Sequence, residues 1–304
     1  MSTIQAYTTA TRPAASASNV GLTIFNTTTK DINVSDGAGW RVYEPDGTTD
    51  NTLSLEFDGG DRLDTTYSMT SVTSYTVMFW MNSTNTSDYI SLVADAAASN
   101  NRGSLEVWRT STPGANGFYV IFKDTSASGL NLKNDITNFN SLCDGEWHHV
   151  AIVFDSSGTY TNVSIYKDGS LAASEDARTA NGWSSDLKTS GTSTADFVFG
   201  GSRYTGALYY TGMMDQMAFF ESALTGTNIS DIYNGSNGGD LLTLGFSPAA
   251  YYRVGYYSED TNSDASVASA GQDIGTVADY SGNNNDASQS SASLKPNYVA
   301  DPAF

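Results

Sequence analysis

The segment LCDGEWHHVAIVFDSSGTYTNVSIYKDGSLAA, residues 142–173, constrains the fold of this chain most strongly. Aromatic and β-branched residues dominate EWHHVAIVF in its first half, and a second run of strand-forming residues, NVSIYK, ends at Asp168-Gly169. An Asp-Gly pair readily adopts the positive φ angles of a tight hairpin turn. The segment therefore predicts two antiparallel strands, each followed by a polar turn.

The first of these strands is apolar on both faces. Alternate residues of a strand point to opposite faces, and here the two faces carry Trp147, Ala151 and Val153 on one side and Val150, Ile152 and Phe154 on the other. Such a strand is normally covered on both sides, as in a sandwich of two sheets. The adjacent His148 and His149 also face opposite ways, so we interpret them as interior or interface residues and not as a catalytic or chelating pair.

Three ordered motifs resemble the laminin-G-like (concanavalin A-like) jelly-roll family. They are LSLEFDGGDRLD with SYTVMFWMNS, then DGEWHHVA with its Lys-Asp-Gly hairpin, then FVFGGS with YYTGMMDQMAFFESALTGTNISDIYN, and together they cover roughly residues 52–235. The resemblance implies an all-β fold, an antiparallel β-sandwich of the jelly-roll type. The strands that are apolar on both faces predict burial of Trp80, Trp147, Val150, Ile152, Phe154, Ile165, Phe199 and Phe219.

The composition agrees with an all-β chain and excludes some partners. Gly, Ser, Thr, Asn and Asp are abundant and aromatic residues reach 12%, which suits short strands joined by tight turns. The net charge of −19 leaves no basic surface to neutralise phosphates, so we expect binding neither to nucleic acid nor to anionic membrane surfaces. No apolar run approaches transmembrane length, so membrane insertion is not expected either. The fold itself does not indicate a function, because it hosts lectins, hydrolases and structural proteins alike.

Residues 1–50 predict a small separate β module. Strands are expected over residues 22–25 and 31–34 and through Trp40 and Val42. The IFNTTTK motif followed by a DGxGW turn resembles a module common near the ends of bacteriophage fibre and other virion proteins. An ordinary β-hairpin appendage is the alternative. The first residues lack the basic start and apolar core of a signal peptide, which agrees with a virion protein made in the host cytoplasm.

The chain is therefore divided into a module at 1–50, a laminin-G-like sandwich at 51–245 and an extended C-terminal segment at 246–304. The last segment resembles the strands that usually open a laminin-G-like domain, although here it comes at the end. Three arrangements stay open: it folds back onto the sandwich in permuted order, it packs on another subunit, or it is a relic of a truncated second domain. Together with the N-terminal module, this segment predicts a homo-oligomer, most simply a homotrimer.

Catalysis is not expected. Glu56 and Asp58 alternate on one strand, as paired carboxylates of jelly-roll glycan hydrolases do, but no third acidic partner follows and the resemblance assigns them to a structural strand and turn. Neither a nucleophile elbow, a P-loop nor a zinc-ligand spacing occurs in the sequence. Cys143, the single cysteine, is interpreted as a small packed residue.

Calcium is the one metal that the resemblance suggests, because related domains hold this ion through oxygens on loops. By motif position the candidate ligands are Asp58, Asp61, Asp215 and Asp279, with Asn283 and Asn285 nearby in the sequence. The alternative is that these Asp and Asn residues only cap turns.

Glycan binding is the other candidate activity. Sugar sites need aromatic side chains beside polar groups, and loops at one edge of a sandwich usually supply them. The candidates are Trp183, Arg203, Tyr204, Tyr209 and Tyr210. The two tyrosines at 209–210 would alternatively belong to the core or to a subunit interface.

These observations favour a bacteriophage virion structural protein, a tail fibre or other appendage, whose lectin-like domain adheres to host-surface glycans. Its partners would be other virion proteins and further copies of itself. One alternative is a purely structural capsid decoration or tail component. The other is a cellular glycan-active enzyme or its carbohydrate-binding module.

Overall fold

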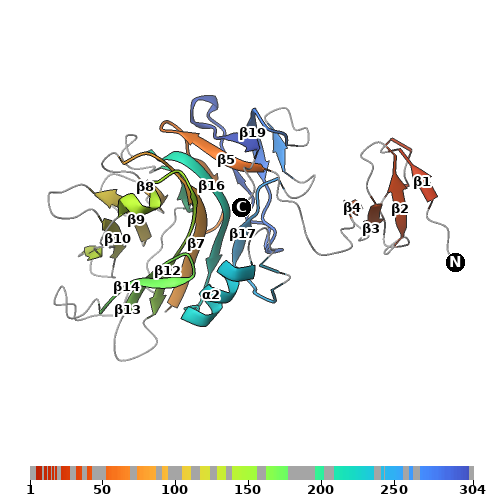
Figure 1. Cartoon of the computed structure of the whole chain (residues 1–304). Coiled ribbons are helices and arrows are strands. Elements are labelled where there is room, and N and C mark those ends of the chain that lie inside the picture. Colours follow the sequence, from red (N-terminus) through yellow and green to blue (C-terminus); the bar gives the residue numbers. More distant parts are fainter. Residues whose placement is uncertain are drawn as a thin grey trace. The chain divides into compact units, whose positions relative to one another are not determined.

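The computed structural model contains two compact units, Met1–Asp50 and Asn51–Phe304, which are described separately below (Figure 1). The structure describes residues 5–8, 10–11, 13–14, 16, 18, 22–27, 32–35, 40–42, 53–68, 74–86, 91–94, 105–110, 117–123, 129–134, 139–155, 162–176, 196–201, 209–235, 241–242, 244–255, 260–262 and 268–300.

The first unit is a four-stranded sheet, as the sequence predicted for a small β module. Its strands, in spatial order, are β1 (Gln5–Tyr7), β2 (Thr23–Asn26), β3 (Ile32–Ser35) and β4 (Trp40–Val42). The β1–β2 pair is parallel, and the other two pairs are antiparallel. Ile24 is fully buried, and the buried Asn26 side chain donates a hydrogen bond of 3.1 Å to Asn33 on the neighbouring strand. Strand β1 lies in a stretch for which the sequence predicted no strand.

The second unit is the expected antiparallel sandwich. One sheet runs, in spatial order, through β14 (Ser170–Asp176), β13 (Asn162–Lys167), β12 (Trp147–Asp155), β7 (Ser74–Asn82), β16 (Thr211–Phe220), β5 (Leu53–Asp58) and β21 (Asn297–Ala300). Strand β17 (Ala250–Tyr252) pairs with the second half of β16, beyond the part that pairs with β5.

The other sheet runs through β11 (Gly129–Asn134), β10 (Gly117–Lys123), β9 (Leu105–Thr110), β8 (Ser91–Ala94), β15 (Val198–Phe199), β6 (Leu63–Thr65), β20 (Ala287–Ser288), β19 (Gln272–Val277) and β18 (Thr261–Asn262). Strand β19 joins the two sheets, because its first residues pair with β21 and its last residues pair with β20.

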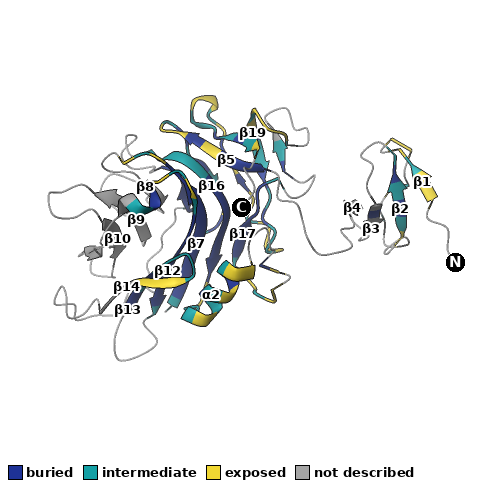
Figure 2. Cartoon of the chain, viewed as in Figure 1, coloured by how far each residue is buried: buried dark blue, intermediate teal, exposed yellow. Residues whose placement is uncertain are grey.

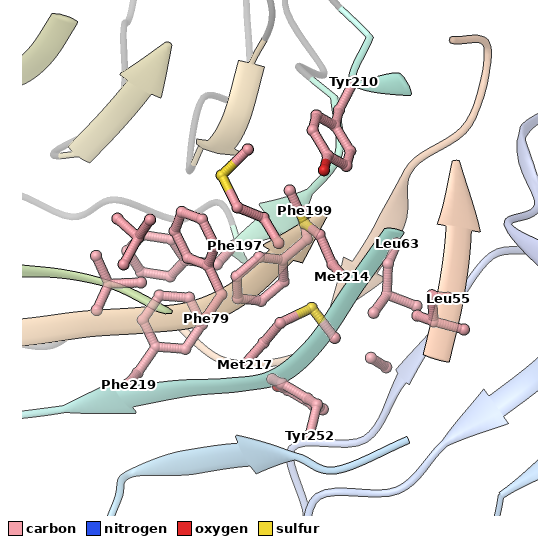
Figure 3. Packing of buried hydrophobic residues seen from close by; sticks show 14 of the residues in the cluster. Leu55, Leu63, Phe79, Phe197, Phe199, Tyr210, Met214, Met217, Phe219 and Tyr252 are labelled. Atoms are coloured by element: carbon pink, nitrogen blue, oxygen red, sulfur yellow. The ribbon is translucent and has the colours of Figure 1, made fainter. Parts of the chain in front are cut away.

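The main core lies between the sheets. Val150, Ile152 and Phe154 of β12 are fully buried in it, together with the aromatic side chains of Phe79, Phe197, Phe199 and Phe219 (Figure 3). Phe197 and Phe219 have ring centroids 4.5 Å apart, so these rings interlock across the two sheets. Of the eight side chains predicted to be buried, Trp147 alone is only partly buried, and the other seven confirm the prediction.

A second core covers the opposite face of the first sheet. It contains Ala151 and Val153 of β12, and helix α2 (Gly226–Gly235) packs Ile229 and Ile232 against it. In Figure 2 the helix is exposed on its outer side, while the strands beneath it are buried. The two-sided apolar pattern of β12 is thus explained by one core on each face. In the described part of the chain no helix is long and apolar enough to cross a membrane.

The C-terminal residues complete both sheets of the same unit. Strand β21 pairs with β5 through Tyr298 and Leu55, β20 pairs with β6 through Ala287 and Thr65, and β17 pairs with β16. Ala287 and Tyr298 are fully buried in the main core. Among the three arrangements left open by the sequence, the structure has the first, a return onto the sandwich in permuted order. Residues 250–300 are therefore not the extended segment that was expected, because they supply edges that β5 and β6 need.

Candidate functional site

Several turns gather at one end of the sandwich. Asn82 at the end of β7 lies opposite both Trp147 and Met213, and Thr211 lies opposite Asp58. The turns that adjoin these positions are residues 58–62, 83–86, 143–146, 168–169 and 209–212, which we call the loop rim.

Hydrogen bonds between these turns fix the loop rim. The Gly145 N–H donates to the Ser83 carbonyl at 3.1 Å, and the Ser83 hydroxyl donates to the Thr211 carbonyl at 2.7 Å. The Tyr210 hydroxyl donates to the carbonyls of Asn82 at 2.9 Å and Met213 at 3.1 Å. Backbone groups that would otherwise need solvent are thus satisfied within the protein, which holds the turns in one arrangement.

His148 bridges two acidic turns of the loop rim. Its Nδ1 lies 2.9 Å from Asp168 Oδ2 and its Nε2 lies 3.1 Å from Asp144 Oδ1. Asp168 stands at φ 48° and Gly169 at φ 72°, the left-handed pair that the Asp-Gly turn predicted. The hydrogen bond that the His148 ring donates to Asp168, together with the charge of that carboxylate, raises the pKa of His148, whereas burial opposes this rise. A protonated His148 therefore ties the turn before β12 to the turn after β13.

His149 has the opposite environment. It is buried under α2, where its ring lies 5.4 Å from the ring of Trp80 and 6.2 Å from that of Tyr233. Burial lowers the pKa of His149 to about 4, so this side chain is neutral around pH 7. The two histidines face opposite sides, as predicted, and His149 is an interior histidine.

Two of the four predicted calcium ligands lie together. Asp61 is buried and accepts a hydrogen bond of 2.9 Å from the Asp58 N–H, and Asp58 accepts one of 2.7 Å from the Gly60 N–H. Burial raises the pKa of Asp61 to about 6; the hydrogen bond from Asp58 opposes this rise, and the charges of Asp58 and Asp273 add to it. This corner of the loop rim therefore concentrates negative charge.

The other two predicted ligands hold backbone elsewhere. Asp215 is fully buried and accepts hydrogen bonds from the N–H groups of Gln216 at 2.6 Å and Val254 at 3.2 Å, at the bulge where β16 changes partner from β5 to β17. Asp279 accepts N–H groups of Tyr251 and Asn285, each at 2.9 Å. Asp279 therefore has the turn-capping role that the sequence left open, whereas Asp215 holds backbone at a bulge within a strand.

The structure does not bring the four candidate ligands into one site. Among the described residues, no group of three or more His, Cys, Asp or Glu side chains is arranged to hold a metal ion. The nearby Asn283 and Asn285 each donate to the Ala249 carbonyl, at 3.0 and 3.1 Å, so they also serve the local loop. Calcium binding stays a prediction, with Asp58 and Asp61 as the pair to which it applies.

The glycan candidates divide into three groups. Trp183, Arg203 and Tyr204 lie outside the described residues. Tyr210 is fully buried in the main core, with its hydroxyl bound to two carbonyls, which agrees with the alternative of a core role. Tyr209 is partly exposed and is the candidate that reaches the surface of the loop rim.

Sequence reasoning missed the side chains that surround these candidates. Arg62 of the loop rim pairs with Asp64 at 2.9 Å, and His148 bridges Asp144 and Asp168. The alternation of Arg62 and Asp64 about the inward-facing Leu63 was a visible signal for the first pair. The second pairing depends on the strand register, which brings Lys167 opposite Val150 and so places the following Asp168 beside His148.

Comparison with known proteins identifies the class to which the sandwich belongs. Residues 57–230 match the concanavalin A-like lectin/glucanases superfamily, more than half of the chain. The chain therefore belongs to this superfamily, as its motifs indicated. No curated protein sequence matches it.

Solved structures agree at the level of the fold. A putative carbohydrate-binding protein from Bacteroides ovatus has 15% sequence identity and a TM-score of 0.54, over 83% of this chain and 60% of that protein. This chain thus spans less than two thirds of that relative. A pentraxin from Limulus polyphemus (16% identity, TM-score 0.41, 62% of this chain and 84% of that one) and the receptor-binding domain of a botulinum neurotoxin C/D mosaic (16%, 0.39, 61% and 46%) are more distant.

The first prediction concerns the two histidines, which are the only ones in the chain. In an NMR pH titration of the imidazole signals, His148 should titrate above 6.5, and His149 should stay neutral down to about pH 4. The imidazole signal that disappears in His148→Gln belongs to His148, and the remaining signal belongs to His149. Two titrations both close to 6.5 would contradict the carboxylate bridge and the buried position.

The same shifts set the direction of stability with pH. His148 has a raised pKa in the folded chain, so its contribution is complete below pH 6.5 and is lost as the pH rises through that raised value. His149 has a lowered pKa, so its contribution is lost as the pH falls from 6.5 toward about 4. In His148→Gln the loss of stability with rising pH should disappear, while the loss of stability with falling pH, which comes from His149, should remain.

A second prediction concerns the acidic corner. Asp61 favours its protonated form in the folded chain, so it contributes stability below pH 3.8 that is lost as the pH rises through about 6. Without calcium, Asp61→Asn should raise the free energy of unfolding by about 1 kcal/mol at pH 8 and by almost nothing at pH 4. Asp231→Asn on the exposed side of α2, which makes the same change in net charge, should have little effect at either pH.

Calcium binding would reverse the effect of Asp61→Asn on the free energy of unfolding at pH 8. If the ion binds at Asp58 and Asp61, excess calcium stabilises the unsubstituted chain by mass action, and Asp61→Asn loses this stabilisation. Thermal melts at pH 8 with calcium and with a chelator distinguish the two cases. Identical melts of the unsubstituted chain in both solutions would remove the calcium prediction.

Proposed function

We propose that this chain is a carbohydrate-binding appendage of a bacteriophage particle. The observation that carries the binding part is the fixed loop rim at one end of a lectin-class sandwich, where the partly exposed Tyr209 lies among hydrogen-bonded turns. Turns held by a rigid pair of sheets are the usual place for recognition. A fixed surface also loses little entropy when a ligand binds.

The comparison with the Bacteroides ovatus protein supports the same activity. That protein is described as a putative carbohydrate-binding protein, and its fold covers 83% of this chain. Host-surface glycans are the ligands that a binding module on a particle would meet. Non-enzymatic binding is proposed because neither Glu56 nor Asp58 has the partners of a hydrolytic pair: both are exposed, and Asp58 instead caps its own turn.

The virion part of the proposal is supported by the N-terminal unit. The IFNTTTK and DGxGW motifs, similar to those of phage fibre modules, lie in a compact unit distinct from the sandwich. Its β1 is an edge strand of three largely exposed residues, and a sheet of this size buries little apolar surface. Attachment to another virion protein, or to two further copies in a homotrimer, would cover such a sheet.

The proposal of a homotrimer is supported by the N-terminal unit alone. The C-terminal segment, which the sequence also suggested as an intersubunit element, packs within its own chain. A purely structural decoration or tail component remains the second candidate, because the same N-terminal unit would serve it equally well.

The third prediction tests binding. The purified full chain should be retained by immobilised polysaccharides from bacterial surfaces, with dissociation constants in the micromolar to millimolar range for a single module. A chain that binds none of them would contradict the adhesion role and favour the structural candidate. Release of reducing sugars during the same incubation would contradict non-enzymatic binding and favour a glycan-active enzyme.

A mass-spectrometric inventory of purified particles tests the virion part. The intact chain should be found in the particles at a copy number divisible by three. Its absence from the particles would contradict the virion role, while the binding assay would stand independently.

A further inference from the structure

Arg62, at the end of the 58–62 turn of the loop rim, forms a rigid polar pair with Asp64. The Arg62 Nε lies 2.9 Å from Asp64 Oδ1, and its Nη2 lies 3.4 Å from Asp64 Oδ2, so the guanidinium faces both carboxylate oxygens. The two residues are two apart on an extended segment, and Leu63 between them points into the main core. About a fifth of the Arg62 side chain and a quarter of the Asp64 side chain remain exposed.

The backbone of Arg62 is held on both sides, which fixes the pair. Its N–H donates to the Leu294 carbonyl at 2.9 Å, and its carbonyl accepts a hydrogen bond of 3.3 Å from the buried Gln289 side chain. Both partners come from the returning C-terminal segment. An arginine and a carboxylate placed in this way offer several donors and acceptors to a ligand without a further loss of conformational freedom.

Tyr209 stands next to this pair. Gly201 lies between the two side chains, and they approach it closely. A Cβ atom on Gly201 would lie 2.9 Å from the Tyr209 ring and 3.0 Å from Arg62 Cβ. Gly201 is buried, and the neighbouring Gly200 accepts the Tyr210 N–H at 2.8 Å, so the backbone on which Tyr209 stands is also fixed. The partly exposed Tyr209 ring thus lies beside the base of the Arg62 side chain, whose guanidinium pairs with Asp64.

This combination matches the surface of a sugar. A pyranose ring has an apolar face of C–H groups, which packs on an aromatic ring, and a rim of hydroxyl groups, which need both donors and acceptors. Tyr209 supplies the first, and the Arg62–Asp64 pair supplies the second.

The local charge selects among sugars. Asp64 already neutralises Arg62, and Asp58 and Asp61 lie close by in the preceding turn, on a chain with a net charge of −19. A carboxylate or sulfate on the ligand would meet this negative field with no basic group left to pair with at Arg62. Uronic and sialic acids are therefore disfavoured.

We propose that Tyr209 and the Arg62–Asp64 pair form the primary sugar subsite, and that it takes a neutral hexopyranose unit with adjacent free hydroxyls. This inference depends on the proposed carbohydrate binding and specifies its place and its ligand class. It also adds Arg62 and Asp64 to Tyr209, which of the two glycan candidates that the structure describes is the one that reaches the surface.

The experiment compares two immobilised polymers, a neutral hexose polysaccharide and a uronic-acid polysaccharide, by biolayer interferometry with the full chain. The neutral polymer should bind more tightly. Tyr209→Ala should weaken that binding by on the order of tenfold, and Tyr209→Trp should retain it. Tyr7→Ala, a tyrosine in the separate N-terminal unit, is the matched control and should bind like the unsubstituted chain.

Asp64→Asn tests the charge argument and does not depend on the tyrosine. The substitution keeps an oxygen acceptor but frees the charge of Arg62, so binding of the uronic-acid polymer relative to the neutral one should rise several-fold. If Tyr209→Ala fails to fold, as its melting curve would reveal, this arm decides: an unchanged ratio overturns the proposal.

The outcomes separate the subsite from the general function. Binding of the neutral polymer that Tyr209→Ala leaves unchanged would overturn the subsite while carbohydrate binding stands. Tighter binding of the uronic-acid polymer by the unsubstituted chain would overturn the ligand class. Failure to bind any polysaccharide would contradict the proposed function itself, and the subsite with it.

Discussion

The sandwich depends on strand β5, which has no neighbour that is close in sequence within its own sheet. Its ladder partners are Met213 and Met214 of β16 on one side and Tyr298 of β21 on the other. Leu55 and Phe57 on β5 are fully buried in the main core, so both edges must be paired for the core to close. Contacts between segments this distant carry a large loop-closure cost, which the burial of apolar surface has to exceed.

The position of β5 also fixes the candidate site. The turn after β5 carries Asp58, Asp61 and Arg62, and the returning segment holds Arg62 through Leu294 and Gln289. Gly200, at φ 74°, lets the β15 end pass directly over Phe57, where a Cβ atom would come within 2.3 Å of the ring. The residues proposed to meet a sugar therefore stand on backbone that the core and the C-terminal strands position together. The contacts that position the proposed subsite are thus also contacts that stabilise the fold.

The sequence predicted what depends on local pattern and missed what depends on distant pairing. The two-sided apolar pattern of β12 correctly predicted a core on each face, and the Asp168-Gly169 pair correctly predicted its hairpin. The scarcity of hydrophobic residues after Asp286 suggested an extended end. Hydrophobic periodicity contains no information about which sheet edge a short strand will join, so this expectation was wrong. The structure instead uses short strands with single buried anchors, such as Ala287 and Tyr298.

The site was predicted less well for a related reason. Asp215 and Asp279 occupy family motif positions, but the N–H groups that occupy their carboxylates, those of Val254 and Tyr251, come from the permuted C-terminal part. Tyr209 and Tyr210 are the same residue type, so composition does not distinguish them. Their position just before β16 is what directs the Tyr210 side chain into the core. Their opposite directions follow from the alternation of an extended segment, once its inward residue is known.

Strands β17, β20 and β21 are an integral part of the sandwich and not an appendage. Native-state amide hydrogen exchange can establish this, with backbone amides of β21 and β20 compared with those of β12. The slowest amides of β12, β20 and β21 should exchange with the same free energy and the same dependence on denaturant, because they open only in global unfolding. Rapid exchange of β20 and β21, independent of denaturant, while β12 stays protected would contradict this role.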